Sequence, residues 1–289
     1  MEIETLLILI GSLAFLVLLY RATSNINRSN NPNVDDEATE KKRGQLKQAL
    51  QRAKGKKLSE EQREIIQDHI GLYKWVPKHL IGPWEERTIA FIENFTCYGM
   101  DKDLPIEKIE LIVASEASLL IVQRPLSDYR HLRRINIWKD VIENHKEARG
   151  TATRNEINLS WNYLEKTIGQ ARDGHNLTLH EFAHLIDFAE DGVAQSIPVT
   201  SHSEDFKEWQ KLVNDEHARL MKAYEGGKNY SIRAYGGYES IKGDKPELFS
   251  CGTSAFFERG SRLKRECPKV YQMMKKFYGV DPANWRQKK

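Results

Sequence analysis

Cysteine is scarce in this sequence, and its spacing excludes two kinds of site. The 289 residues contain three cysteines, Cys97, Cys251 and Cys267, and no Cys-x-x-Cys pair. An odd number of widely separated cysteines predicts neither a disulfide framework nor a zinc cluster built on thiolates. Cysteine usage therefore favours a reducing compartment.

A strong charge of one sign is also missing. The chain has 44 Lys and Arg against 41 Asp and Glu, which gives a formal net charge of +3. So small an excess provides no broad positive field, and we do not expect the protein to bind nucleic acid. The sequence also has no Gly-rich phosphate loop and no internal repeat. Its 40% hydrophobic content is that of an ordinary globular protein.

The N-terminus does contain one long apolar run, from Leu6 to Tyr20. A helix of roughly 17 residues can cross a thin hydrocarbon core. Acidic residues, Glu2 and Glu4, precede the run where a cleaved signal peptide would have basic ones. Residues 1–21 are therefore predicted to be an uncleaved membrane anchor in contact with the lipid bilayer.

Basic residues after this run predict the orientation of the chain. They are Arg21, Arg28, Lys41, Lys42 and Arg43. Because positive charge favours the cytoplasmic side, the sequence predicts a single-pass protein of the cytoplasmic (inner) membrane whose main domain faces the cytoplasm.

The remainder divides by composition into a linker and one domain. Residues 22–57 are Asn-rich and then mixed in charge, which predicts a polar linker with some helix near Lys41 to Lys54. Within residues 58–289, Pro105 to Val122 has the pattern of a buried helix. His131 to Ile142 and Thr153 to Trp161 have strand-like patterns. We expect an α+β domain, mostly helical with a small sheet.

The strongest chemical signal is the sequence His-Glu-Phe-Ala-His at residues 180–184. On a helix, His180 and His184 lie on one face, one turn apart, so both imidazoles can bind one Zn²⁺. Glu181 projects roughly 100° around the helix and is the candidate general base. The alternative is a pair of core histidines bonded to carbonyl groups. The apolar neighbours predict a buried helix, where such polar groups need partners, and a cation supplies one.

Further ligands and supports must come from other positions. Asp187 shares a face with His180 and would accept a hydrogen bond from a zinc-binding imidazole or lie solvated at the helix end. A catalytic zinc has three protein ligands, and no third histidine follows at short spacing. A carboxylate on a later helix is expected. Glu247, after Pro246 at a helix start, is favoured over the alternatives Glu239 and Glu258.

The stretch LSWNYLEKTIGQARDGHNLTLHEFAHLIDFAEDG resembles the Mlc titration factor A family of zinc metallopeptidases, and weaker similarity extends over Leu72 to Trp285. This resemblance implies a zincin-like fold with Zn²⁺ bound by His180, His184 and Glu247. The family has Glu-Phe-Phe-Ala where this chain has Glu-Leu-Phe-Ser. It also implies a tyrosine that stabilises the oxyanion, for which Tyr235 is the best match and Tyr238 the alternative.

These features predict a membrane-anchored zinc peptidase acting on a peptide or protein substrate, with Glu181 as the general base. The resemblance suggests aminopeptidase-like activity, and endopeptidase action stays open. The alternative is a membrane-tethered binding protein that sequesters a cytoplasmic regulatory protein, with zinc structural or activity incidental. Replacing Glu181 by Gln distinguishes the two.

Overall fold

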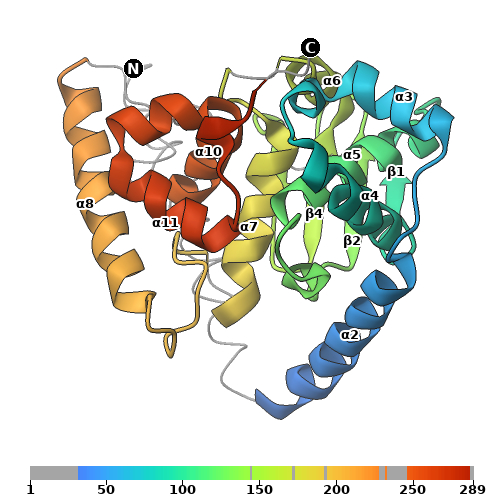
Figure 1. Ribbon diagram of the computed structural model, residues 1–289, viewed down its shortest axis with the longest axis horizontal. Coiled ribbons are helices and arrows are strands. Elements are labelled where there is room, and N and C mark those ends of the chain that lie inside the picture. The colour runs from blue at the N-terminus through green and yellow to red at the C-terminus, as the bar shows by residue number, and fades with distance from the viewer. Residues whose placement is uncertain are drawn as a thin grey trace, which may run out of the picture. The chain divides into compact units, whose positions relative to one another are not determined.

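The computed structural model describes residues 32–143, 145–170, 173–191, 194–227, 232 and 246–286. Residues Gln45–Lys289 form one compact unit, and the other unit is Met1–Gly44. The described part of the chain is mostly helical with a small sheet (Figure 1). Its helices are α2 (Pro32–Ala53), α3 (Glu60–His69), α4 (Lys78–Ile92), α5 (Ile106–Leu120), α6 (Trp161–Ile168), α7 (Leu177–Asp191), α8 (Phe206–Glu225), α10 (Pro246–Glu266) and α11 (Pro268–Tyr278). Shorter 3₁₀ turns are η1 (Gly71–Lys74), η2 (Leu126–Tyr129) and η3 (Pro282–Asn284).

The sheet is mixed, with the strand order β1-β2-β4-β3. Its strands are β1 (Cys97–Gly99), β2 (Arg134–Trp138), β3 (Gly150–Ala152) and β4 (Glu156–Ser160). β1, β2 and β4 run parallel, whereas β3 pairs with β4 in the antiparallel direction. The sheet therefore has an antiparallel edge at β3, which becomes important for the candidate site.

Both strands predicted from the sequence are present, with one difference in detail. β4 has the register Ile135↔Ile157 and Ile137↔Leu159 with β2, and these four side chains are buried. β4 is buried on both faces, since Asn158 is buried as well, and its Oδ1 accepts a hydrogen bond from Asn136 Nδ2 at 3.0 Å. This pairing satisfies polar groups that would otherwise be costly to bury. Val141, predicted to extend the first strand, lies outside β2 and is exposed.

The buried helix predicted for Pro105 to Val122 is confirmed as α5, which begins just after Pro105. It is enclosed almost all round because it packs against α3, α4 and α7 as well as β1. One of its buried side chains is ionisable: Glu116 is only 1% exposed. A buried carboxyl group needs a specific partner, and its partner lies at the start of α7.

Glu116 and Asn176 together define where α7 begins. Asn176 Nδ2 donates to Glu116 Oε1 at 2.6 Å, while Asn176 Oδ1 accepts the backbone N–H of Leu179 at 2.9 Å. The second bond is a side-chain cap on the first turn of α7. α7 is thus tied to α5 at its first residues, upstream of the His-Glu-Phe-Ala-His motif.

The pKa of Glu116 makes this anchor sensitive to pH. Burial raises it from 4.5 to about 7, although the hydrogen bonds from Asn176 and Thr178 lower it. Between these two values the folded chain holds a proton that the unfolded chain releases, so stability falls as the pH rises. Glutamine at position 116 does not titrate. At pH 8 the free energy of unfolding of Glu116→Gln is therefore expected to exceed that of the unaltered protein by on the order of 1 to 3 kcal/mol.

That gain should be much smaller at pH 5, which is close to the unfolded value of 4.5, and should disappear below pH 4.5, where the glutamate is largely protonated in both states. Urea unfolding of both proteins at pH 5 and pH 8 measures the difference. An equal difference at the two pH values would contradict a proton held by Glu116.

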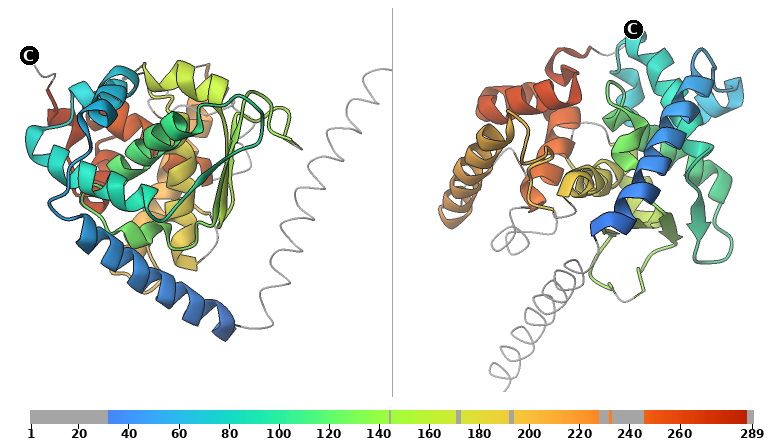
Figure 2. Two further views of the ribbon diagram at one scale, coloured as in Figure 1. Left: turned by 90° about the vertical axis from the view of Figure 1, so that its right-hand side faces the viewer. Right: turned by 90° about the horizontal axis from the view of Figure 1, so that it is seen from below.

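α7 occupies the centre of the compact unit. It lies between the sheet and α10, and contacts β3 and β4 on one side and α10 on the other (Figure 1; Figure 2, right). Phe182 and Ala183 are fully buried, and Phe182 packs against Phe91 and Tyr129. The middle of α7 is therefore held rigidly from both sides.

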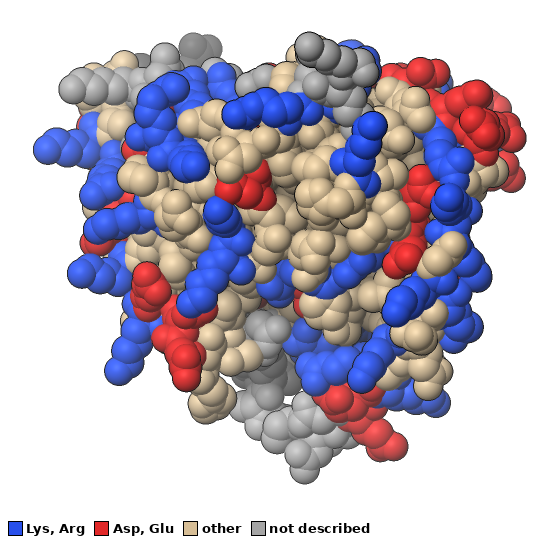
Figure 3. Space-filling model, viewed as in Figure 1, with Lys and Arg blue, Asp and Glu red and all other residues tan. Residues whose placement is uncertain are grey.

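The molecular surface shows charged side chains of both signs among uncharged ones (Figure 3). On the face shown in Figure 3, basic and acidic residues are interspersed. This distribution agrees with the small formal charge of +3.

The prediction of a single-pass membrane location requires correction. Among the described residues, no helix is long and apolar enough to cross a bilayer. The longest described helices, α2, α8 and α10, all contain many charged residues. The anchor predicted for residues 1–21 lies outside the described residues.

Candidate metal centre

The motif histidines lie side by side in the middle of α7. Their ring centroids are 4.9 Å apart, with the planes at 82° to each other. Both are buried, His180 being 3% and His184 8% exposed. The spacing of four residues and the apolar neighbours of the motif lead to this arrangement, as expected for an amphipathic helix facing a core.

Glu247 reaches both histidines from the first turn of α10. Its Oε2 atom lies 3.2 Å from His180 Nε2, and its Oε1 atom 3.5 Å from His184 Nε2. The Glu247 side chain is 23% exposed, so the group is open to solvent on one side. The structure thus brings together the three residues that the sequence suggested as metal ligands.

The two competing carboxylates lie elsewhere. Glu258 is buried, and its Oε2 accepts the backbone N–H of Gly174 at 2.7 Å. It therefore supports the loop before α7 instead of meeting the histidines. Glu239 lies outside the described residues.

Charge complementarity governs the ionisation of this group. Burial alone would raise the pKa of Glu247, but the two imidazoles hold it well below its usual range. Burial would lower the pKa of His184, but the Glu247 carboxylate reverses the effect and raises it to about 9. The site consequently stabilises a positive charge placed next to Glu247.

Glu181 lies on a different face of α7, next to strand β3. Burial raises its pKa, and the Glu247 carboxylate adds to the effect, while the two histidines oppose it. A Cβ atom built on Gly150 would come within 2.5 Å of Glu181 Oε1. Only a glycine at position 150 therefore leaves room for the Glu181 carboxylate beside the strand.

Asp187 has a role different from either sequence expectation. It is 1% exposed, so it is not solvated at a helix end. Its Oδ2 accepts the backbone N–H groups of Gln195 at 2.8 Å and Ser196 at 2.7 Å. Asp187 therefore holds the loop that follows α7.

Cys251 is a neighbour of the site that sequence reasoning missed. His180, Glu247 and Cys251 have potential ligand atoms within 4.8 Å of one another. Cys251 Sγ lies 3.9 Å from His180 Nδ1, whereas Glu247 faces Nε2 of the same ring. Cys251 and Glu247 therefore face different nitrogens of the His180 ring. Its spacing of four residues from Glu247 on a helix was the signal that could have identified it.

The tyrosines suggested for oxyanion stabilisation, Tyr235 and Tyr238, lie outside the described residues.

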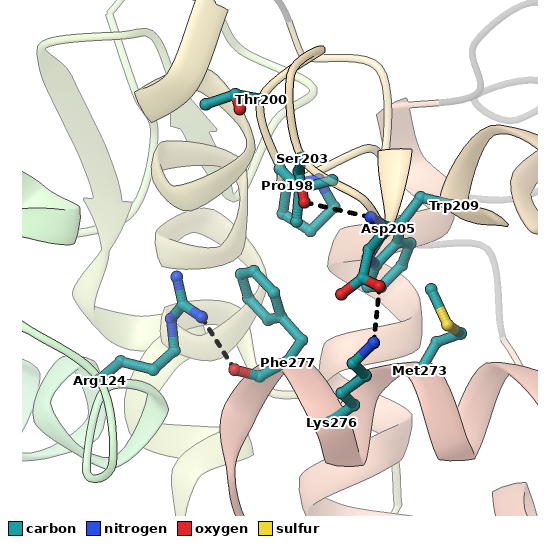
Figure 4. A pocket seen from close by; sticks show the side chains of 10 residues that line it. Arg124, Pro198, Thr200, Ser203, Asp205, Trp209, Met273, Lys276 and Phe277 are labelled. Carbon is teal, nitrogen blue, oxygen red and sulfur yellow. Dashed lines mark hydrogen bonds and ion pairs between the residues drawn. The ribbon is translucent and has the colours of Figure 1, made fainter. Parts of the chain in front are cut away.

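A separate hollow of about 370 Å³ lies between the loop after Ser196, α8 and α11. Figure 4 shows the ion pair at its edge, with Lys276 Nζ 2.6 Å from Asp205 Oδ1, and Arg124 Nη1 donating to the carbonyl oxygen of Phe277 at 2.8 Å. The lining includes neither histidine of the motif nor Glu181 or Glu247. Two lining residues, Trp209 and Phe277, pack against Phe249 in the first turn of α10.

Comparison with known proteins indicates a metallopeptidase family. The family model described as "Glucose-regulated metallo-peptidase M90" matches residues 41–279. An uncharacterized protein of Synechocystis sp. is 23% identical over 234 residues, which cover 75% of this chain and 83% of that protein. Mlc titration factor A of Pectobacterium atrosepticum is 26% identical over 44% of this chain and 45% of its own length. Mlc titration factor A of Edwardsiella ictaluri is 30% identical over 38% of this chain and 40% of its own length.

Proposed function

The chain belongs to the glucose-regulated metallo-peptidase M90 family, and from this premise we propose that it is a zinc-dependent peptidase whose ligands are His180, His184 and Glu247. The observation that carries the proposal is the convergence of two imidazole nitrogens on the oxygens of one carboxylate, at 3.2 and 3.5 Å. Zinc bonds of about 2.0 to 2.1 Å in tetrahedral geometry place neighbouring ligand atoms about 3.3 Å apart. The donor set and its spacing therefore fit this ion.

The parts around the site support a zincin-like arrangement. The histidines and Glu181 are on one helix, the third carboxylate is on a later helix, and a small sheet lies against the first helix. Three protein ligands leave a fourth position of a tetrahedral ion for water or substrate. The partial exposure of Glu247 supports access of solvent to a metal bound here.

The chemistry then divides between the ion and this chain. A bound divalent ion would supply positive charge that activates a water and polarises a peptide carbonyl. Glu181 accepts a proton from the attacking water and passes it to the leaving amine. Its raised pKa suits this exchange, because a general base works best when its pKa lies near the working pH.

The open edge of β3 provides a place for a peptide substrate. Ser160 N–H donates to the Arg149 carbonyl and Thr153 N–H to the Glu156 carbonyl, at 2.9 and 2.8 Å. Hydrogen-bonded pairs alternate along an antiparallel pair, so the backbone groups of Gly150 and Ala152 point away from β4. An extended peptide that pairs with this edge would pass Glu181 at Gly150.

The test is metal content together with cleavage. The full-length protein should retain about one equivalent of zinc, and chelation should abolish peptide cleavage that added zinc restores. The zinc content of His184→Ala should fall well below one equivalent, because only two of the three protein ligands remain. A full-length protein that is folded but binds no zinc, or a His184→Ala variant that retains it, would overturn the proposal.

The names of two relatives favour a second candidate function. Both are called Mlc titration factor A, which suggests binding of a regulatory protein. In that case this chain would sequester such a partner, with zinc structural or peptidase activity incidental. Cleavage by the unaltered protein and its loss in Glu181→Gln distinguish an enzyme from a binding protein, because binding needs no general base.

A further inference from the structure

The proposed mechanism does not use the loop that follows α7 and leads to α8. Ser196 lies in this loop and is fully buried. The φ angle of Ser196 is +62°, a left-handed conformation that non-glycine residues seldom adopt. Such a conformation persists only where the surroundings determine it, so the contacts of Ser196 indicate what it does.

Asp187 holds the loop in this conformation from the side of α7. Asp187 Oδ2 accepts the N–H groups of Gln195 and Ser196 at 2.8 and 2.7 Å, and the N–H of Ile197 also bonds to this carboxylate. Successive N–H groups around one carboxylate form an anion-binding nest. Asp187 follows the ligand His184 by less than one turn of α7.

The side chain of Ser196 continues the connection into α10. Its Oγ accepts the backbone N–H of Phe249 at 2.8 Å, in a buried contact. N–H groups in the first turn of a helix are the ones that partners outside the helix can bind. Phe249 lies in the same first turn as the ligand Glu247.

These contacts connect the two ligand helices. Asp187, on the same helix as His184, binds the Ser196 N–H, and Ser196 Oγ binds the first turn of α10. Glu247 in that turn lies 3.5 Å from His184. A metal site needs its ligands held within about 0.5 Å of the productive geometry. The link through Ser196 is a polar connection between the two ligand helices that reaches the first turn of α10 itself.

We propose that Ser196 is a positioning residue for the metal centre: its hydroxyl fixes the first turn of α10 so that Glu247 meets the two histidines. This inference rests on the proposed function, since it takes the group as a metal site. The same loop continues through Pro198, Val199 and Thr200 along the hollow of Figure 4. Its far side is therefore accessible, whereas Ser196 itself is not.

The experiment measures zinc affinity of the full-length protein by competition with a chromophoric chelator. Ser196→Ala removes the acceptor for the Phe249 N–H and is expected to weaken zinc binding about 10- to 100-fold, as is usual for groups that orient metal ligands. Circular dichroism on the same samples verifies that the variants are folded. Ser196→Gly removes the hydroxyl and also relieves the left-handed strain, and should lose as much affinity.

Ser261→Ala is the matched control. Ser261 is on the same helix, beyond the non-helical residue Arg259, and its Oγ donates to the Ala283 carbonyl at 3.0 Å. The Ser261→Ala variant should bind zinc with the affinity of the unaltered protein, even if its stability is lower.

Each outcome decides the inference. Unchanged zinc affinity in folded Ser196→Ala overturns it and leaves the proposed function intact. If Ser196→Ala loses zinc affinity but Ser196→Gly retains it, the loss comes from the backbone conformation, and the role of the hydroxyl is overturned. An unaltered protein that binds no zinc overturns the proposed function and this inference together.

Discussion

Replacing Glu181 by glutamine is expected to lower kcat for peptide hydrolysis by on the order of 10²- to 10⁴-fold, while zinc content stays at the level of the unaltered protein. Glutamine has nearly the same shape but cannot accept the proton of an attacking water. Glu181 lies on a face of α7 different from that of the two histidines, and beside Gly150. The loss should therefore appear in turnover and not in the metal.

Steady-state kinetics on a fluorogenic peptide, with metal analysis of the same samples, measures both quantities. Glu116→Gln is a matched control, because it also neutralises a buried glutamate but acts at the start of α7. The control should cleave normally. Normal turnover in Glu181→Gln would remove this carboxylate from the mechanism.

Gly150→Ala is the second change with a large expected effect. The new Cβ would lie 2.5 Å from Glu181 Oε1 and 2.7 Å from Leu177 Cδ1, closer than real Cβ contacts. The Glu181 side chain must move aside, and a displacement of about 1 Å at a reacting group can cost 100-fold in rate. We expect kcat to fall roughly 10- to 100-fold with zinc binding retained, because both histidines and Glu247 stay in place.

Gly44→Ala provides the comparison for this variant. Gly44 lies within α2, and a Cβ atom there meets nothing within 4 Å. Alanine is a better helix former than glycine by about 1 kcal/mol, so the control should be fully active and slightly more stable. Kinetics and thermal unfolding on both variants separate crowding of Glu181 from a general effect of an added methyl group. Full activity in Gly150→Ala would show that β3 does not confine the base.

The local features of the site could be predicted from the sequence. A spacing of four residues on an apolar helix sets the relation of His180 to His184, and this needs no knowledge of the rest of the chain. The buried helix at α5 and the strands β2 and β4 follow from equally local patterns. The carboxylate at position 247 was favoured over two others only modestly by local pattern, because its approach to the histidines depends on how α10 packs against α7.

The missed features have separate physical causes. β1 and β3 have three residues each, too few to show an alternating pattern. Asp187 was expected either to meet an imidazole or to be solvated, but its partners are backbone groups in a loop that the sequence does not mark. The single-pass membrane location was wrong for the described residues, whose longest helices are too rich in charge. The roles of Tyr235 and Tyr238 stay predictions.

The brevity of β3 has a consequence for behaviour in concentrated solution. An unpaired edge strand of a sheet can pair with another copy of the same molecule, and long, flat edge strands are the most prone to aggregation. With three residues, beginning at a glycine, β3 offers few hydrogen bonds to such a neighbour. An edge this short gives a second copy of the molecule little to pair with, which limits edge-to-edge association.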